Sequence, residues 1–203
     1  MRRLLVGIVF FAVLPLLAAQ AAELGRLQLN GKTIILIDDG TWRYADAASP
    51  QGGCAEGIVA KSTVLPLSAC FHNKIWKTTS SNNNDFELLY ARRGGDMYGG
   101  LISERIPLDE ATLRAAIIDN AAGDDGSDDV VITQERDETF AGQQWKYIEY
   151  QLVFGGTTFR FANYFKKLGE EGSAQLVFWT ADKFFETERS NIEQVAKTLV
   201  IGD

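Results

Sequence analysis

The sequence contains a single histidine, His72, and only two cysteines, Cys54 and Cys70. A Ser-His-Asp or Cys-His catalytic arrangement would have to use His72, because these mechanisms need an imidazole as the base. The residues around His72, Phe71–Lys74, do not resemble a nucleophile elbow. We therefore expect His72 to be a loop or strand-edge residue, and the sequence predicts a protein that is not an enzyme.

The two cysteines are 16 positions apart. An even number of cysteines in an exported protein favours a disulfide, here between Cys54 and Cys70. The alternative is a redox-active pair, but that chemistry usually uses Cys-x-x-Cys spacing and a lowered thiol pKa. Because the thiols are assigned to a disulfide, a zinc site based on His72 is not expected. The sequence predicts no cofactor and no metal site.

The first residues have the pattern of a signal peptide, residues 1–21. Arg2 and Arg3 form a basic start, an apolar run follows from Leu4 to Leu17, and Ala19–Ala21 fits a small-x-small cleavage site. The run is short for a membrane span, which needs about 20 apolar residues; an uncleaved anchor is the alternative. No cysteine lies near the cleavage site for lipid attachment. We expect a periplasmic protein without stable membrane insertion after cleavage.

The chain is acidic, with a formal net charge of −7. Loss of the two arginines in the signal peptide would lower this charge to −9. Such a protein is a poor partner for nucleic acid or for an anionic membrane surface. Hydrophobic residues make up 46% of the sequence and include four tryptophans, which indicates a folded core and argues against disorder.

Residues 22–45 read as a small β-meander. Asn30-Gly31 is a strong hairpin signal, and Asp38-Asp39-Gly40 turns the chain toward a third strand that begins at Thr41. A carbohydrate or cation site formed by the two aspartates and Trp42 is the alternative, but turn chemistry explains the same residues. Residues 46–53 are small, polar and interrupted by proline and glycine, which is typical of a linker.

Residues 54–203 contain the longer elements. A helix is expected from about Pro107 to Gly123, and a second one begins at a capping box, Ser190–Glu193. Gly155-Gly156 predicts a hairpin between two alternating strands. The fold class is therefore α+β, an antiparallel sheet flanked by helices. The expected strands are 86–91, 99–106, 130–136, 145–154, 158–166 and 174–179.

From about residue 67 to 201 the chain resembles the PsbP-like group, which includes bacterial DcrB-like periplasmic proteins. The resemblance rests on element order and on Ile75–Lys77, Arg105–Leu108, Gln175–Thr180 and Phe184-Phe185 followed by Ser190–Leu199. It implies an antiparallel sheet flanked by helices and a binding or accessory role. The lipobox common in the bacterial relatives is missing here, and residues before 46 lie outside the family pattern.

Two groups of residues remain as candidate sites. The acidic stretch 119–129 is a weak match to a calcium loop, because Gly126 and Asp129 stand where a ligand and a glycine are required; a solvated loop is the simpler reading. The aromatic residues of the adjacent strands are expected mostly in the core. If one sheet face is uncovered, Trp145, Tyr147 and Tyr164 form a possible binding face.

The function expected from the sequence is that of an exported accessory protein that binds an unknown protein partner in the cell envelope. One alternative is a binder of a small apolar ligand or lipid, held in a cleft between sheet and helix. Another alternative is a metal-dependent enzyme that uses the acidic stretch 119–129.

Overall fold

The computed structural model describes residues 23–29, 32–37, 42–44, 54, 57–80, 85–95, 97–123 and 129–202. The chain divides into two compact units, residues 1–45 and 46–203. In the first unit, strands β1 (Glu23–Leu29), β2 (Lys32–Ile37) and β3 (Trp42–Tyr44) form an antiparallel sheet in that order, as predicted. The signal peptide, the Asp38-Asp39-Gly40 turn and the linker 46–53 lie outside the described residues.

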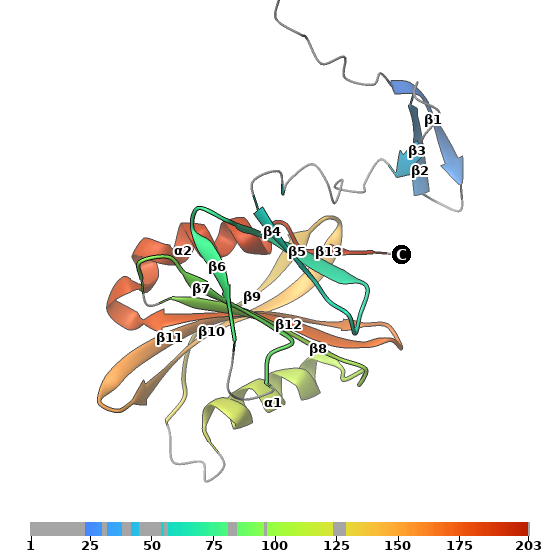
Figure 1. The fold of residues 1–203 in the computed structure, drawn as a ribbon. Coiled ribbons are helices and arrows are strands. Elements are labelled where there is room, and N and C mark those ends of the chain that lie inside the picture. The colour runs from blue at the N-terminus through green and yellow to red at the C-terminus, as the bar shows by residue number, and fades with distance from the viewer. Residues whose placement is uncertain are drawn as a thin grey trace, which may run out of the picture. The chain divides into compact units, whose positions relative to one another are not determined.

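The second unit is built on a seven-stranded antiparallel sheet (Figure 1). Three long neighbouring strands, β10, β11 and β12, pair in continuous registers that bury side chains on both faces. In spatial order the strands are β6 (Trp76–Thr79), β7 (Leu88–Arg92), β8 (Tyr98–Glu104), β12 (Gly172–Ala181), β11 (Thr157–Leu168), β10 (Gln143–Phe154) and β9 (Val131–Phe140).

A smaller antiparallel sheet has the order β13 (Val200–Ile201), β5 (Leu67–His72), β4 (Gly57–Lys61). The predicted disulfide is present and joins Cys54, just before β4, to Cys70 in β5. The bridge passes close to Gly57, where any Cβ would collide with both sulphur atoms. A glycine at this position is therefore a steric requirement of the bridge.

The two helices lie on opposite sides of the large sheet (Figure 1). Helix α1 (Glu110–Ala121) is capped by Asp109, whose side chain accepts a hydrogen bond from the Thr112 N–H. It packs Leu113 and Ile117 against Ile148. Helix α2 (Asp182–Ala196) and the small sheet cover the other face.

The C-terminal helix begins earlier than the sequence predicts. Ser190–Glu193 does not cap the helix, because α2 already begins at Asp182 and follows β12 directly, with Ala181 at the N-cap position. The predicted stripe is nevertheless correct, and it is buried against the sheet; its members are Ile192, Val195, Ala196 and Leu199. The predicted fold class, α+β with an antiparallel sheet flanked by helices, is confirmed.

Candidate functional site

The sheet has two chemically different faces, which the strand registers define. Along β10, Trp145, Tyr147 and Glu149 point toward α2, whereas Ile148 and Tyr150 point toward α1, because side chains alternate along a strand. We call these two surfaces the α2 face and the α1 face.

The predicted binding face is wrong. Trp145, Tyr147 and Tyr164 lie on the α2 face and are 1–2% exposed, because α2 and the small sheet pack over them. They belong to the hydrophobic core and offer no surface to a partner. The partly exposed aromatic side chains of the central strands lie on the α1 face instead.

On the α1 face, aromatic rings from four neighbouring strands stack on one another beside α1. We call this group the aromatic row; its members are Tyr98, Trp179, Phe161 and Tyr150, with Phe86 from the loop before β7. The centroid distances are 5.3 Å from Tyr98 to Trp179, 6.2 Å from Trp179 to Phe161, and 5.0 Å from Phe161 to Tyr150. Each ring is supported by its neighbours, so the row is a rigid apolar surface.

The aromatic row is only partly covered. Tyr150, next to α1, is buried, but Phe161, Trp179 and Phe86 are half-buried, and Tyr98 is 38% exposed. Phe86 stacks on Trp179 at 5.2 Å and lies over Gly100, where a Cβ would collide with its ring. A glycine in β8 thus allows a fifth ring to join the surface.

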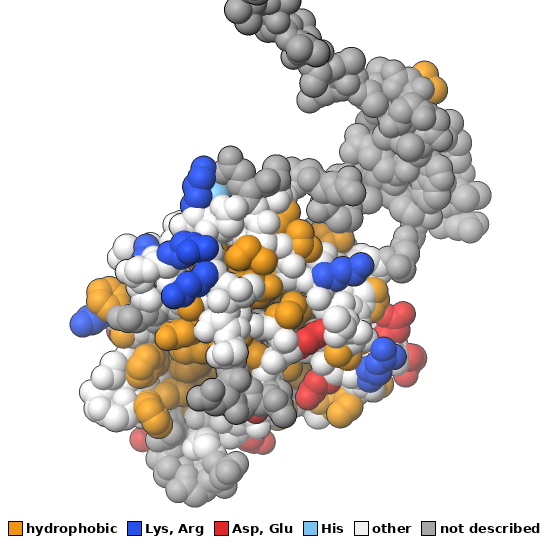
Figure 2. Space-filling model, in the orientation of Figure 1, with side chains coloured by type: hydrophobic (Ala, Val, Ile, Leu, Met, Phe, Trp, Pro, Cys, Tyr) orange, Lys and Arg blue, Asp and Glu red, His pale blue; other side chains and the backbone are white. Residues whose placement is uncertain are grey.

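More apolar side chains surround the tip of the β10–β11 hairpin. Val153 is 55% exposed and Phe154 is 70% exposed. Figure 2 shows hydrophobic side chains gathered on the visible face near this end of the sheet, with lysine and arginine side chains above them. Single exposed apolar residues are normal in proteins, but several of them gathered at one end of a sheet indicate an interaction surface.

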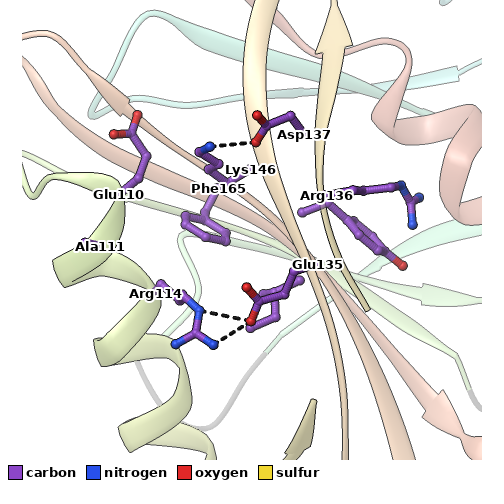
Figure 3. Close-up of a pocket in the computed structure, with 10 residues that line it drawn as sticks. Glu110, Ala111, Arg114, Glu135, Arg136, Asp137, Lys146 and Phe165 are labelled. Atoms are coloured by element: carbon purple, nitrogen blue, oxygen red, sulfur yellow. Dashed lines mark hydrogen bonds and ion pairs between the residues drawn. The ribbon is translucent and has the colours of Figure 1, made fainter. Parts of the chain in front are cut away.

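A pocket of about 570 Å³ lies on the other side of α1, between that helix and strands β9 and β10 (Figure 3). Its rim is charged: Arg114 in α1 pairs with Glu135 in β9 at 2.5 Å, and Lys146 in β10 pairs with Asp137 in β9 at 2.6 Å. All four side chains are 40–48% exposed, so each pair contributes little to stability. The pocket floor is apolar and includes Ile148 and Phe165.

On the α2 face, a buried carboxylate lies at the centre of an ionic network. The Glu149 side chain is 3% exposed, and its oxygens accept hydrogen bonds from Tyr147 Oη at 2.7 Å and from Arg189 Nη1 at 3.0 Å. Arg160 Nη1 donates at 3.3 Å, and Thr133 Oγ1 shares its proton between a carboxylate oxygen at 3.2 Å and the main-chain oxygen of Glu149 at 3.1 Å. Four donors fill the acceptor positions of the carboxylate.

The same two arginines reach the surface side of α2. Arg160 also binds Asp182 and Glu186, and Arg189 binds Glu186 through two of its nitrogens. Because Asp182, Glu186 and Arg189 belong to α2 while Glu149 and Arg160 belong to β10 and β11, the network joins the helix to the sheet. Its groups are all paired, which indicates a structural role.

The pKa of Glu149 gives a pH prediction. Burial acts to raise this pKa, but hydrogen bonds from Arg189 and Tyr147 outweigh burial and lower the pKa below its usual 4.5. A carboxyl with a lowered folded-state pKa adds stability above its unfolded-state pKa and loses it as pH falls through the folded-state value. We expect the free energy of unfolding of the wild type to fall below about pH 4.5.

Urea unfolding at pH 7, 4.5 and 3 would measure this effect. The stability difference between the wild type and Glu149→Gln should be largest at pH 7 and should shrink toward pH 3. A difference that stays constant over this range would contradict the assignment of the acid transition to Glu149.

The other predicted residues are also placed. His72 lies at the end of β5, and its Nδ1 accepts a hydrogen bond from the Lys74 N–H. Of the acidic stretch, residues 124–128 lie outside the described residues, so the calcium-loop alternative stays a prediction. Across the part of the chain that the structure describes, no three His, Cys, Asp or Glu side chains are arranged to hold a metal ion. No helix in that part is long and apolar enough to cross a membrane.

Comparisons with known proteins agree with the architecture. No family model matches the sequence, and no curated protein matches it. The solution structure of cyanobacterial PsbP from Synechocystis sp. PCC 6803 is similar over 75% of this chain and 99% of that protein, with a TM-score of 0.55 and 14% identity.

Two further solved structures are more distant. The Ran-binding protein Mog1p of Saccharomyces cerevisiae covers 91% of this chain and 97% of its own length, with a TM-score of 0.39 and 10% identity. A Bacteroides thetaiotaomicron protein covers 73% of this chain and 49% of its own, with a TM-score of 0.48 and 12% identity. The similarity to cyanobacterial PsbP shows that this chain has the PsbP-like fold, as its sequence resemblance implies.

Proposed function

We propose that this protein is a non-catalytic accessory protein of the cell envelope that binds another protein through the aromatic row. The observation that carries the proposal is the partly exposed stack of rings on the α1 face, which α1 covers only at Tyr150. Tyrosine and tryptophan are enriched among the residues that dominate binding energy in protein interfaces. The Cys54–Cys70 disulfide supports an oxidising compartment such as the periplasm.

The shape of the surface indicates the chemistry of the partner. The exposed rings come from neighbouring strands and present a shallow apolar strip with one phenolic group, that of Tyr98. Such a strip suits the apolar side of a helix or an extended segment, whose side chains would cover the rings and exclude water. The charged groups near α2 are already paired with one another, so they are not needed for this contact.

Photo-crosslinking from the surface itself would test the proposal. A benzoyl-phenylalanine at position 98 should give one discrete protein adduct in the envelope, whereas the same group at position 59, in β4, should not. The adduct partner, once purified, should bind at least tenfold more weakly to Tyr98→Ala and Trp179→Ala than to the wild type, while Val59→Ala binds normally. Equal binding by all these variants would refute the proposed site, provided that their circular dichroism spectra match.

The pocket beside α1 favours a second candidate, a small-ligand binder. Its volume of about 570 Å³ is within the range of ligand sites, and it lies between sheet and helix. The ion pairs on its rim suit a ligand with a charged or polar end better than a wholly apolar one. Native mass spectrometry of gently purified protein would detect such a ligand, and its loss in Arg114→Ala would assign it to this pocket.

A further inference from the structure

The β10–β11 hairpin extends past both of its neighbours. The pairing of β10 with β9 ends at Gln151 with Val131, and the pairing of β11 with β12 ends at Phe159 with Ala181. Within these registers, Leu152 pairs with Phe159, and beyond that pair residues 153–158 pair only with each other. Figure 1 shows this tip at the lower left, beyond the end of the sheet. The turn is made by Gly155 and Gly156, both at positive φ, as in a type I′ hairpin.

The projecting tip is apolar on both sides. Val153 and Phe154 are adjacent in a strand, so their side chains point to opposite faces, and they are 55% and 70% exposed. From Gln151 to Thr158 there is no charged residue, although 23% of the whole chain is charged. A hairpin end of this kind is normally polar, because it is surrounded by water.

Other exposed apolar residues lie at the same end of the sheet. Val131 and Ile132, at the start of β9, are 54% and 39% exposed, and Phe184, in the first turn of α2, is 43% exposed. The Lys183 ammonium is 4.8 Å from the Phe184 ring. A lysine beside exposed aromatic and aliphatic side chains is the arrangement found where a protein meets lipid headgroups.

We propose that the tip of residues 153–158 inserts into the headgroup region of a zwitterionic phospholipid bilayer. A bilayer surrounds an inserted wedge on both sides, which matches the opposite directions of Val153 and Phe154. So short a tip is too small for a stable protein interface, which needs roughly 800 Å² on each partner. The net charge of −7 opposes binding to anionic lipid, which leaves a neutral surface as the favoured target.

The contact is peripheral and reversible. Two partly exposed side chains supply far less apolar area than a spanning helix, so the partition should be weak and should depend strongly on each of them. This contact uses a surface next to the aromatic row but not the row itself. Variants of the tip should therefore lose vesicle binding without losing protein binding, and variants of the aromatic row should do the reverse.

Vesicle flotation with the purified chain would test the inference. Phosphatidylcholine vesicles should carry the wild type upward in the gradient, and Phe154→Ser should lower the partition coefficient at least tenfold, about 1.4 kcal/mol. Val153→Ser should also lower it, whereas Val59→Ser should not. The two valines are a matched pair, since each is 55% exposed.

Three results would overturn the inference. One is the absence of partition by the wild type, and another is an equal loss in Phe154→Ser and Val59→Ser. The third is that Phe154→Ser abolishes the photo-crosslinked adduct formed from position 98, while neither this variant nor the wild type binds vesicles. That result would assign the tip to a protein contact. Because all three side chains are exposed, circular dichroism should show native folding in every variant.

Discussion

Glu149→Gln should lower the free energy of unfolding by about 3–5 kcal/mol, because it removes one partner from a buried ionic network. The amide would leave Arg160 and Arg189 without a buried countercharge, and it would bring its own N–H donors toward them. The network joins β10 and β11 to α2, so the helix should become less firmly attached to the sheet. Urea unfolding at pH 7, with unchanged m-value, would measure the loss.

A matched control comes from the exposed pair beside α1. Glu135→Gln removes the partner of Arg114, but both side chains are at least 40% exposed, so the expected loss is about 1 kcal/mol or less. The comparison separates burial from charge pairing, since each variant removes one carboxylate from an arginine. If the two variants lost equal stability, the buried network would have no special role in holding α2.

Phe178→Ala should have a comparably large effect of about 3–5 kcal/mol, because it opens a cavity in the core between the two sheets. Phe178 in β12 is fully buried, and its ring centroid lies 6.1 Å from Phe71 of the small sheet and 5.8 Å from Trp76. Beneath it, Gly99 has no Cβ and so leaves room for the ring. Thermal and urea unfolding would both report the loss.

Phe154→Ala provides the control for this change, since it removes the same ring from a side chain that is 70% exposed. Its expected effect on stability is within about 0.5 kcal/mol. A similar loss in both variants would contradict the burial of Phe178. The near-neutral effect at Phe154 is also what allows the hairpin-tip variants to test lipid contact without unfolding the protein.

The sequence predicted the strands and turns well where one residue pattern dominated. The alternation in Trp145–Phe154 and the glycine pair at 155–156 placed the longest hairpin correctly, because period-two alternation and positive-φ turns are local properties. The stripe that begins at Ile192 was likewise correct as a helix face packed on the sheet. The bounds of that helix differ from the prediction: it starts at Asp182, directly after β12, and it ends at Ala196, so that Leu199 lies beyond it.

The candidate site was harder to predict because alternation shows that two faces exist but not which of them is covered. In β10 both faces carry large apolar or aromatic side chains. Trp145 and Tyr147 lie on one face, and Ile148 and Tyr150 lie on the other. The choice between them depends on where α1 and α2 pack, which is a long-range property. Glu149 was missed for the same reason, since its partner arginines are 11 and 40 residues away in the sequence.

The Cys54–Cys70 bridge has a mechanical consequence. Tension applied to the chain before Cys54 would pass through the sulphur–sulphur bond directly into β5. Residues 55–69, including all of β4, would then be excluded from the force-carrying path. The hydrogen bonds between β4 and β5 would therefore not be pulled apart from that end, and reduction of the bridge would expose them to the full tension.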